Sequence, residues 1–285
     1  MSSKKKILWF IIVLMGLSFG LQIYILLNGG VESDTFNKLA PVIMYLPALL
    51  TVAFLIITKE GLKSINWKIG KPLYLFYGAI IPAFLALLLA LVISFFNLGE
   101  IIHFSLVENE VVISKGKFLL RKNAQSIPFF MLNYFLTALA FSVVSGFLAF
   151  GEELGWRGFL QKRLIDSNGV FWGIVILGSI WGFWHFPFII SGYNYPESPI
   201  LGAFILFPLT TIFASFFLAW LTLKANSFWP AVLAHGSVNA FMGSILAGMN
   251  FGSNRLYADI FILSFWAIVG TLSYISIKKW VKLRV

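Results

Sequence analysis

The chain of 285 residues contains no cysteine, and only 11% of its residues are charged. The missing cysteines exclude disulfide bonds, thiolate nucleophiles and thiolate metal sites. Soluble domains carry about 25% charged residues, so the low charge argues against a soluble fold. Hydrophobic residues make up 59% of the chain, and the mean hydropathy is +0.90. These values are typical of a polytopic membrane protein.

Long apolar runs predict the fold, because a helix that spans a bilayer needs about 20 apolar residues. The sequence predicts an all-α bundle of about eight transmembrane helices, at approximately 7–27, 39–58, 73–96, 128–150, 171–191, 200–223, 229–249 and 257–277. The first run follows three lysines, as in a signal peptide, but no small-residue cleavage site ends it, so we expect an uncleaved span. No repeat or linker divides residues 1–285, which are expected to form a single transmembrane domain.

The distribution of basic residues predicts the orientation. With the N-terminus inside, the inside segments hold 15 of the 21 Lys and Arg residues, as expected for cytoplasmic loops. Both termini are therefore predicted to be cytoplasmic. The same rule explains the net charge of +10, and no basic-aromatic module indicates nucleic-acid binding. The long polar loop at about 97–127 is expected to form an interfacial helix or a short hairpin.

Acidic residues are scarce, and two of the eleven are adjacent in an apolar region, at Glu152 and Glu153. A charged side chain at the bilayer centre costs roughly 2.5–3.5 kcal/mol on insertion scales, so such residues usually have a function. Six polar residues remain inside the apolar segments once loops are set aside: Glu152, Glu153, Arg157, His185, His235 and Asn239.

The spacing of the first three residues separates the two carboxylates. Glu153 and Arg157 are four residues apart, so on a helix they share a face and can form an ion pair. Glu152 is rotated by about 100° and is expected to face a cavity. The alternative for Arg157 is a side chain that extends to the cytoplasmic surface.

The second element places a histidine near Glu152. A turn is expected near residues 167–169, with Glu152 16 residues before Asn168 and His185 17 residues after it. Two antiparallel helices about this turn bring the carboxylate and the imidazole to one depth, where they form a plausible general-base pair. The alternative is a core histidine hydrogen-bonded within an aromatic belt.

The third element combines His235 with Asn239, four residues later on the same helical face. Hydrogen bonding between helices would also explain these two residues. All three elements lie at a similar depth, which predicts a pocket that opens to the cytoplasm.

The three elements together resemble the CPBP family of intramembrane proteases, which includes the type II CAAX prenyl protease and the bacteriocin-immunity (Abi) proteins. They match Glu-Glu-x-x-x-Arg at 152–157, aromatic-x-x-x-His at 181–185 and His-x-x-x-Asn at 235–239, in the family's order. The resemblance covers about 145–245, within a protease core of about 128–249. The family's second motif usually begins with Phe. Trp181 stands there in this chain, and we expect it to change the pocket's shape more than its chemistry.

The resemblance implies hydrolysis of a peptide bond in or near the membrane. Glu152 and His185 would activate a water, and His235 and Asn239 would stabilise the oxyanion. Glu153 and Arg157 would orient the site. A zinc ion is left open, since Glu152, His185 and His235 offer three ligands. No His-Glu-x-x-His motif occurs, and we favour a glutamate-dependent site that needs no cofactor.

The expected partners are the lipid bilayer and a protein or peptide substrate in or at the membrane, with lipid modification of the substrate left open. The expected location is the bacterial plasma membrane. Two other functions are kept as alternatives: a non-catalytic immunity or scaffold protein that binds a peptide or membrane partner, and a small transporter, because intramembrane ionisable residues also line transport routes.

Overall fold

The computed structural model describes residues 3–115, 118–120 and 122–282, and these are mostly helical. Six helical segments are long and apolar enough to cross a membrane: Lys5–Leu27, Asp34–Ile57, Pro72–Phe95, Ile127–Trp184, Pro199–Ala225 and Gly252–Lys282. The fourth is a hairpin, bent at Gly169 with φ 76° and ψ 169°, where the sequence predicts the turn. The chain is thus an all-α integral membrane protein, as predicted.

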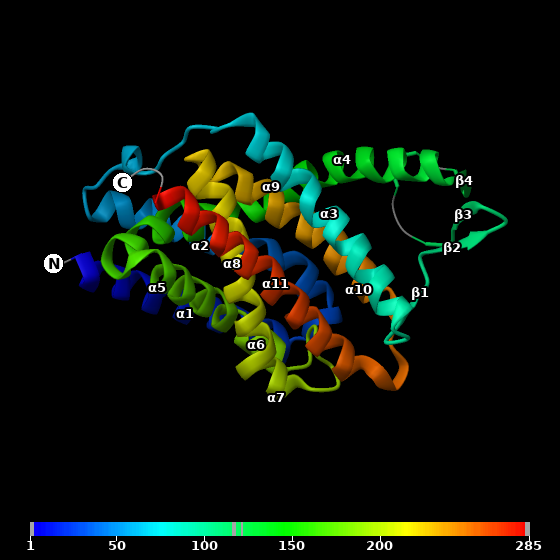
Figure 1. Cartoon of the computed structure of the whole chain (residues 1–285). Coiled ribbons are helices and arrows are strands. Elements are labelled where there is room, and N and C mark those ends of the chain that lie inside the picture. Colours follow the sequence, from blue (N-terminus) through cyan, green and yellow to red (C-terminus); the bar gives the residue numbers. More distant parts are fainter. Residues whose placement is uncertain (1–2, 116–117, 121, 283–285) are drawn as a thin grey trace.

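The described helices are labelled in chain order in Figure 1. They are α1 Ser3–Leu27, α2 Asp34–Ile57, α3 Pro72–Phe95, α4 Ile127–Glu153, α5 Gln161–Trp184, α6 Phe186–Ile190, α7 Pro199–Leu201, α8 Phe207–Ala225, α9 Trp229–Ser237, α10 Gly243–Ala247 and α11 Arg255–Lys282. Helix α1 begins and α11 ends at the same end of the bundle (Figure 1). Which end is cytoplasmic stays a prediction.

The polar loop forms a small sheet at the opposite end of the bundle (Figure 1). Strands β2 (Phe104–Val107), β3 (Glu110–Ile113) and β4 (Ala124–Ser126) are antiparallel in the order β2-β3-β4. Strand β1 (Glu100–Ile101) pairs with β5 (Met249–Asn250), which joins the loop to the chain between α10 and α11. The hairpin alternative is therefore the correct one for this loop.

Small residues let the helices that carry the motifs approach closely, as is common in membrane bundles. A Cβ atom at Gly236 of α9 would lie 2.6 Å from the carbonyl oxygen of Ser142 in α4. A Cβ atom at Gly155 would lie 3.0 Å from the backbone oxygen of Pro47 in α2. The two glycines thus allow α9 and α2 to pack against the segment that carries the paired glutamates.

The helix around the paired glutamates is longer than the sequence predicts. The predicted span ends at 150, whereas the helix continues through Glu153 into a π-helical segment, η3 (Leu154–Leu160), and on into α5. Two further π-helical segments are η4 (Gly202–Leu206), which precedes α8, and η5 (Val238–Met242), which follows α9. Single π-helical turns inside α-helices are frequent at functional sites. Of the three, η3 and η5 adjoin a predicted motif and η4 does not.

Candidate active site

Glu153 lies at the centre of a buried network of charged and polar side chains. Its Oε1 atom accepts a hydrogen bond from Arg157 Nη1 at 2.8 Å and contacts His235 Nδ1 at 2.8 Å. Arg157 Nη2 donates to Ser215 Oγ of α8 at 3.0 Å. The side chains of Glu153 and Arg157 are both 0% exposed. The predicted ion pair is therefore present, and Arg157 does not extend to the surface.

Glu152 points to a different set of partners. Its Oε2 atom accepts hydrogen bonds from two indole N–H groups, Trp181 Nε1 at 2.9 Å and Trp156 Nε1 at 3.3 Å. The residue is 2% exposed. Two neutral donors on one oxygen stabilise the carboxylate without cancelling its charge, and they leave Oε1 to accept a proton or a further hydrogen bond.

Trp181 connects the carboxylates to His185. Its ring lies under the Arg157 guanidinium, 4.6 Å from the ring centroid, and its backbone oxygen contacts His185 Nδ1 at 2.9 Å. No hydrogen bond joins Glu152 directly to His185 in the described part of the chain. The predicted partners Glu152 and His185 are therefore linked through Trp181. The indole bond to Glu152 also corrects our expectation that Trp181 changes shape more than chemistry, because Phe has no such donor.

The hydrogen bonds fix how each imidazole is presented. A carbonyl oxygen only accepts, so His185 must carry its proton on Nδ1 and keep Nε2 as the basic nitrogen when neutral. His235 likewise directs Nδ1 to a carboxylate, and the same assignment leaves its Nε2 facing away from Glu153. Both histidines are held in one orientation by their Nδ1 atoms.

Asn239 is separated from the buried network. His235 is 4% exposed, whereas Asn239 is exposed and lies in η5. A π-helix has more residues per turn than an α-helix, so two residues four apart across its start no longer share one face. The structure brings together five of the six predicted residues, and the oxyanion function of Asn239 stays a prediction.

The three predicted metal ligands do not gather at one point. Among the residues that the structure describes, no three His, Asp or Glu side chains are placed to hold a metal ion. Glu152 Oε2 already accepts two indole hydrogen bonds, and His235 Nδ1 contacts Glu153. The arrangement does not fit a three-ligand zinc site, and we derive no step through a metal.

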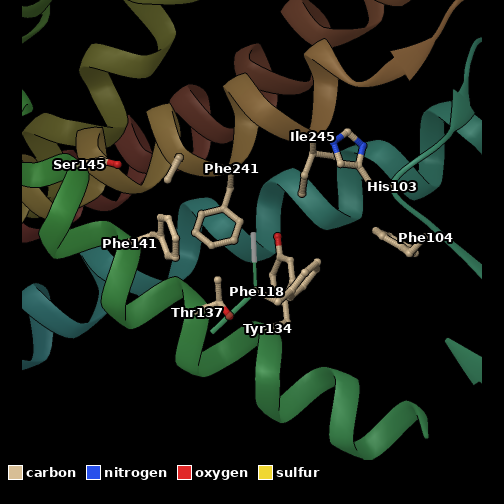
Figure 2. A pocket seen from close by; sticks show the side chains of 10 residues that line it. His103, Phe104, Phe118, Tyr134, Thr137, Phe141, Ser145, Phe241 and Ile245 are labelled. Carbon is tan, nitrogen blue, oxygen red and sulfur yellow. The ribbon is translucent and has the colours of Figure 1, made fainter. Parts of the chain in front are cut away.

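An apolar cavity of about 350 Å³ is bordered by α4 and by the segment from η5 to α10 (Figure 2). Its walls are largely aromatic, and they come from α4, η5 and α10, from the start of β2 with the residue before it, and from the connection between β3 and β4. The lining residues are His103, Phe104, Phe118, Tyr134, Thr137, Phe141, Ser145, Ala240, Phe241 and Ile245. Ser145 is seven residues before Glu152, which is about 10 Å along the helix.

His103 is the one histidine of the chain outside the predicted site, and it lies in the cavity wall. Burial lowers the pKa of His103, and nearby Lys115 lowers it further. The side chain is therefore favoured in its neutral form, which suits an apolar cavity.

Sequence reasoning missed the tryptophan donors and the residues that support them. Trp156 is four residues after Glu152, the same spacing that predicts the Glu153–Arg157 pair. This spacing also predicts that the Trp156 and Glu152 side chains share a helix face and can form a hydrogen bond. Trp181 was noted only as a departure from the family's motif. Nothing in the sequence singled out Ser215, because contact between α8 and η3 is a property of the packed bundle.

The comparisons with known proteins both give CAAX prenyl proteases as similar proteins. Residues 131–241 match the family model described as "Type II CAAX prenyl endopeptidase Rce1-like". The chain is also similar to "CAAX prenyl protease 2" of Methanococcus maripaludis, at 31% identity over 94 residues, covering 31% of this chain and 34% of the relative. The chain thus spans about a third of the length of the curated relative it matches. The matched region contains Glu152, Glu153, Arg157, His185, His235 and Asn239.

The resemblance drawn from the motifs is therefore confirmed over residues 131–241, which are similar to the Rce1-like type II CAAX prenyl endopeptidases.

Proposed function

We propose that the chain is an intramembrane endopeptidase that hydrolyses a peptide bond of a membrane-associated protein or peptide. The observation that carries the proposal is the buried Glu152 carboxylate, held on one oxygen by two indole donors and linked through Trp181 to His185 Nδ1. A carboxylate is costly to bury even with hydrogen-bond donors, so one kept inside a membrane protein usually has a function. The match of residues 131–241 to a family model of endopeptidases supports the same reaction.

In this proposal Glu152 and His185 activate one water molecule. Glu152 Oε1 or His185 Nε2 accepts a proton from the water, whose oxygen forms a bond to the carbonyl carbon of the substrate. The C–N bond then breaks as the same proton is delivered to the leaving nitrogen. The products are a carboxylic acid and an amine, which become a carboxylate and an ammonium group when the acid proton passes to the amine, and no oxidant or cofactor enters the balance.

His235 is proposed to stabilise the oxyanion. Glu152 and Glu153 carry two formal negative charges and Arg157 carries one positive charge, so a protonated His235 would bring the buried network to neutrality. An imidazolium held by Glu153 at Nδ1 offers its Nε2–H to the developing oxygen charge. Asn239, on the next helical segment, would add a second donor when substrate is bound.

We propose that an apolar part of the substrate occupies the cavity between α4 and η5. Support comes from its aromatic lining and from its place about two helical turns from Glu152. A lipid group on the substrate, or an apolar peptide segment, would fit such a lining. Ser145→Phe would narrow the cavity nearest Glu152, and it should raise KM for apolar substrates while leaving short polar peptides unaffected.

The decisive experiment compares Glu152→Gln and His185→Ala with the wild type. The purified chain in detergent or lipid vesicles would be given two internally quenched peptides with a Cys-aliphatic-aliphatic-X terminus, one farnesylated and one not. We expect cleavage by the wild type and a loss of at least 100-fold, as expected for a general base, in both variants. Full activity in both variants would refute the assignment.

Treatment with a metal chelator distinguishes the glutamate-dependent mechanism from a metal-dependent one. A site that needs no metal should keep its activity after treatment with a strong zinc chelator. Loss of activity on chelation, restored by added Zn²⁺, would replace the glutamate-dependent mechanism with a metal-dependent one. If the wild type protects cells or binds a peptide without cleaving it, the non-catalytic immunity or scaffold function replaces the peptidase.

A further inference from the structure

Two polar residues of α1 are buried against the helix that carries His185. Ser18 and Gln22 are four residues apart, and they are 0% and 1% exposed. Trp184 Nε1 donates to Ser18 Oγ at 2.6 Å, and Gln22 Nε2 donates to the Trp184 backbone oxygen at 2.8 Å. Both bonds therefore reach the residue directly before His185. Helix α1 lies outside residues 131–241, the region matched to the family.

The Trp184 carbonyl needs a partner from another helix because α5 breaks there. Pro187 has no N–H group and interrupts the helical hydrogen bonds. In a continuing helix the Phe188 N–H group would bond to the Trp184 carbonyl. Here it bonds to the carbonyl of His185 at 3.0 Å. Gln22 supplies the hydrogen bond that the continuing helix does not provide. A buried carbonyl without a donor would be unfavourable, and water is the usual substitute.

Trp184 in turn contacts one residue of the proposed water-activating pair, His185, and a hydrogen-bond donor of the other, Glu152. Its ring packs edge-on against the His185 ring, with centroids 4.7 Å apart and an interplanar angle of 88°. It also contacts the Trp156 ring at 5.8 Å, and Trp156 donates to Glu152. A shift of Trp184 would therefore displace the His185 imidazole and one of the two donors to Glu152.

Gln22 does not satisfy both of its own side-chain polar atoms at this position. Gln22 Oε1 is buried and has no hydrogen-bond partner within the described residues. Leaving an acceptor unsatisfied in an apolar interior opposes stability. An apolar residue at this position would avoid that cost but would lose the donor to Trp184.

We propose that Ser18 and Gln22 are positioning residues of the peptidase site. They hold Trp184 at the break after α5, and through it they fix the His185 ring and the Trp156 indole. The N-terminal helix is then part of the catalytic assembly and not only a membrane anchor. This inference rests on the proposed function for its kinetic consequence, whereas its structural consequence at His185 is independent of that function.

The test uses the full-length protein with Gln22→Met and the milder Ser18→Ala. Gln161→Met is the matched control, since Gln161 is 4% exposed and donates to Thr222 Oγ1 at 2.8 Å instead of to a residue of the site. The chain has three histidines, so ¹⁵N-histidine labelling gives few NMR signals, which His→Gln variants would assign. The farnesylated quenched peptide reports kcat and KM.

We expect Gln22→Met to lower kcat about tenfold, as for the loss of one hydrogen bond of about 1.4 kcal/mol, with KM within about twofold. The ¹⁵N signals of His185 should shift, those of His103 should not, and Ser18→Ala should give a smaller change of the same kind. Gln161→Met should change neither kcat nor the His185 signals.

Unshifted His185 signals in Gln22→Met, or an equal loss of kcat in Gln161→Met, would overturn the inference. If Gln22→Met fails to fold, unchanged kcat and unchanged His185 signals in Ser18→Ala would do the same. If the wild type cleaves neither peptide and the His185 signals still shift in Gln22→Met, the positioning by α1 stands and the peptidase function fails.

Discussion

Trp181 donates its indole N–H to Glu152 Oε2 across 2.9 Å, from α5 to α4. The same residue accepts from His185 at its backbone oxygen and packs its ring against Arg157. One aromatic side chain thus connects the carboxylate, the imidazole and the guanidinium of the site. Its contribution can be measured by removing the N–H group alone.

Trp181→Phe keeps an aromatic ring and removes the donor. A hydrogen bond to a charged group contributes about 1.5–3 kcal/mol, so we expect kcat to fall about 10- to 100-fold with little change in KM. Steady-state cleavage of the quenched peptide measures this. Trp220→Phe is the matched control, because Trp220 Nε1 is buried and bonds to no described residue. Equal kinetics for Trp181→Phe and the wild type would show that the bond does not matter for catalysis.

The buried ion pair gives a prediction about stability. Glu153→Leu leaves the Arg157 guanidinium in the interior without its carboxylate, and breaking a buried pair in this way costs about 3–5 kcal/mol. Thermal unfolding in detergent should show a large drop in Tm. The double variant Glu153→Leu/Arg157→Met should recover part of it, since no unpaired charge remains. A double variant less stable than Glu153→Leu would contradict this account.

An exposed pair of the same spacing provides the control for that experiment. Lys162 and Asp166 are also four residues apart, but their side chains are 77% and 59% exposed. Exposed pairs contribute little to stability. Asp166→Leu should therefore leave Tm close to that of the wild type.

The close approach of α2 to η3 predicts a steric effect at Gly155. A methyl group there would lie 2.5 Å from Pro47 Cβ and 3.0 Å from the Pro47 backbone oxygen. Gly155→Ala should lower the free energy of unfolding by about 1–3 kcal/mol, as overpacking usually does. Gly16→Ala in α1 is the control, because nothing lies within 4 Å of the added Cβ. If both variants unfold at the wild-type temperature, the two segments are not in rigid contact.

Glu60 predicts how stability depends on pH. Lys6 donates to its Oε1 at 2.8 Å and Arg163 to its Oε2 at 2.7 Å, and these hydrogen bonds lower the pKa of the Glu60 carboxyl. A lowered folded-state pKa stabilises the protein above the unfolded pKa of about 4.3. This stabilisation is lost as the pH falls through the folded-state value.

The variant Glu60→Gln isolates this contribution. It should be less stable than the wild type at about pH 7, and the difference should shrink as the pH falls below about 4.3 and through the folded-state pKa of Glu60. Thermal unfolding of both proteins in detergent across this range measures the difference. A constant difference at every pH would mean that the carboxylate charge is not responsible.

The sequence by itself determined the membrane fold and the identity of the candidate residues. Apolar runs of bilayer length, the turn at Gly169 and the four-residue spacing of Glu153 and Arg157 are local features, and helix geometry converts them directly into structure. Residues that are costly inside a membrane also stand out in a sequence of low charge, and this is what makes them the candidate site residues.

Only the tertiary structure decided how the site is connected. Glu153 binds His235 from α9 as well as Arg157, and Glu152 reaches His185 through Trp181 and not directly. Asn239 lies apart because the π-helical turn at Val238 changes the helical phase, and α1 reaches Trp184 from more than 160 residues away. These contacts depend on which helices touch and at what register, and no local pattern of residues encodes either.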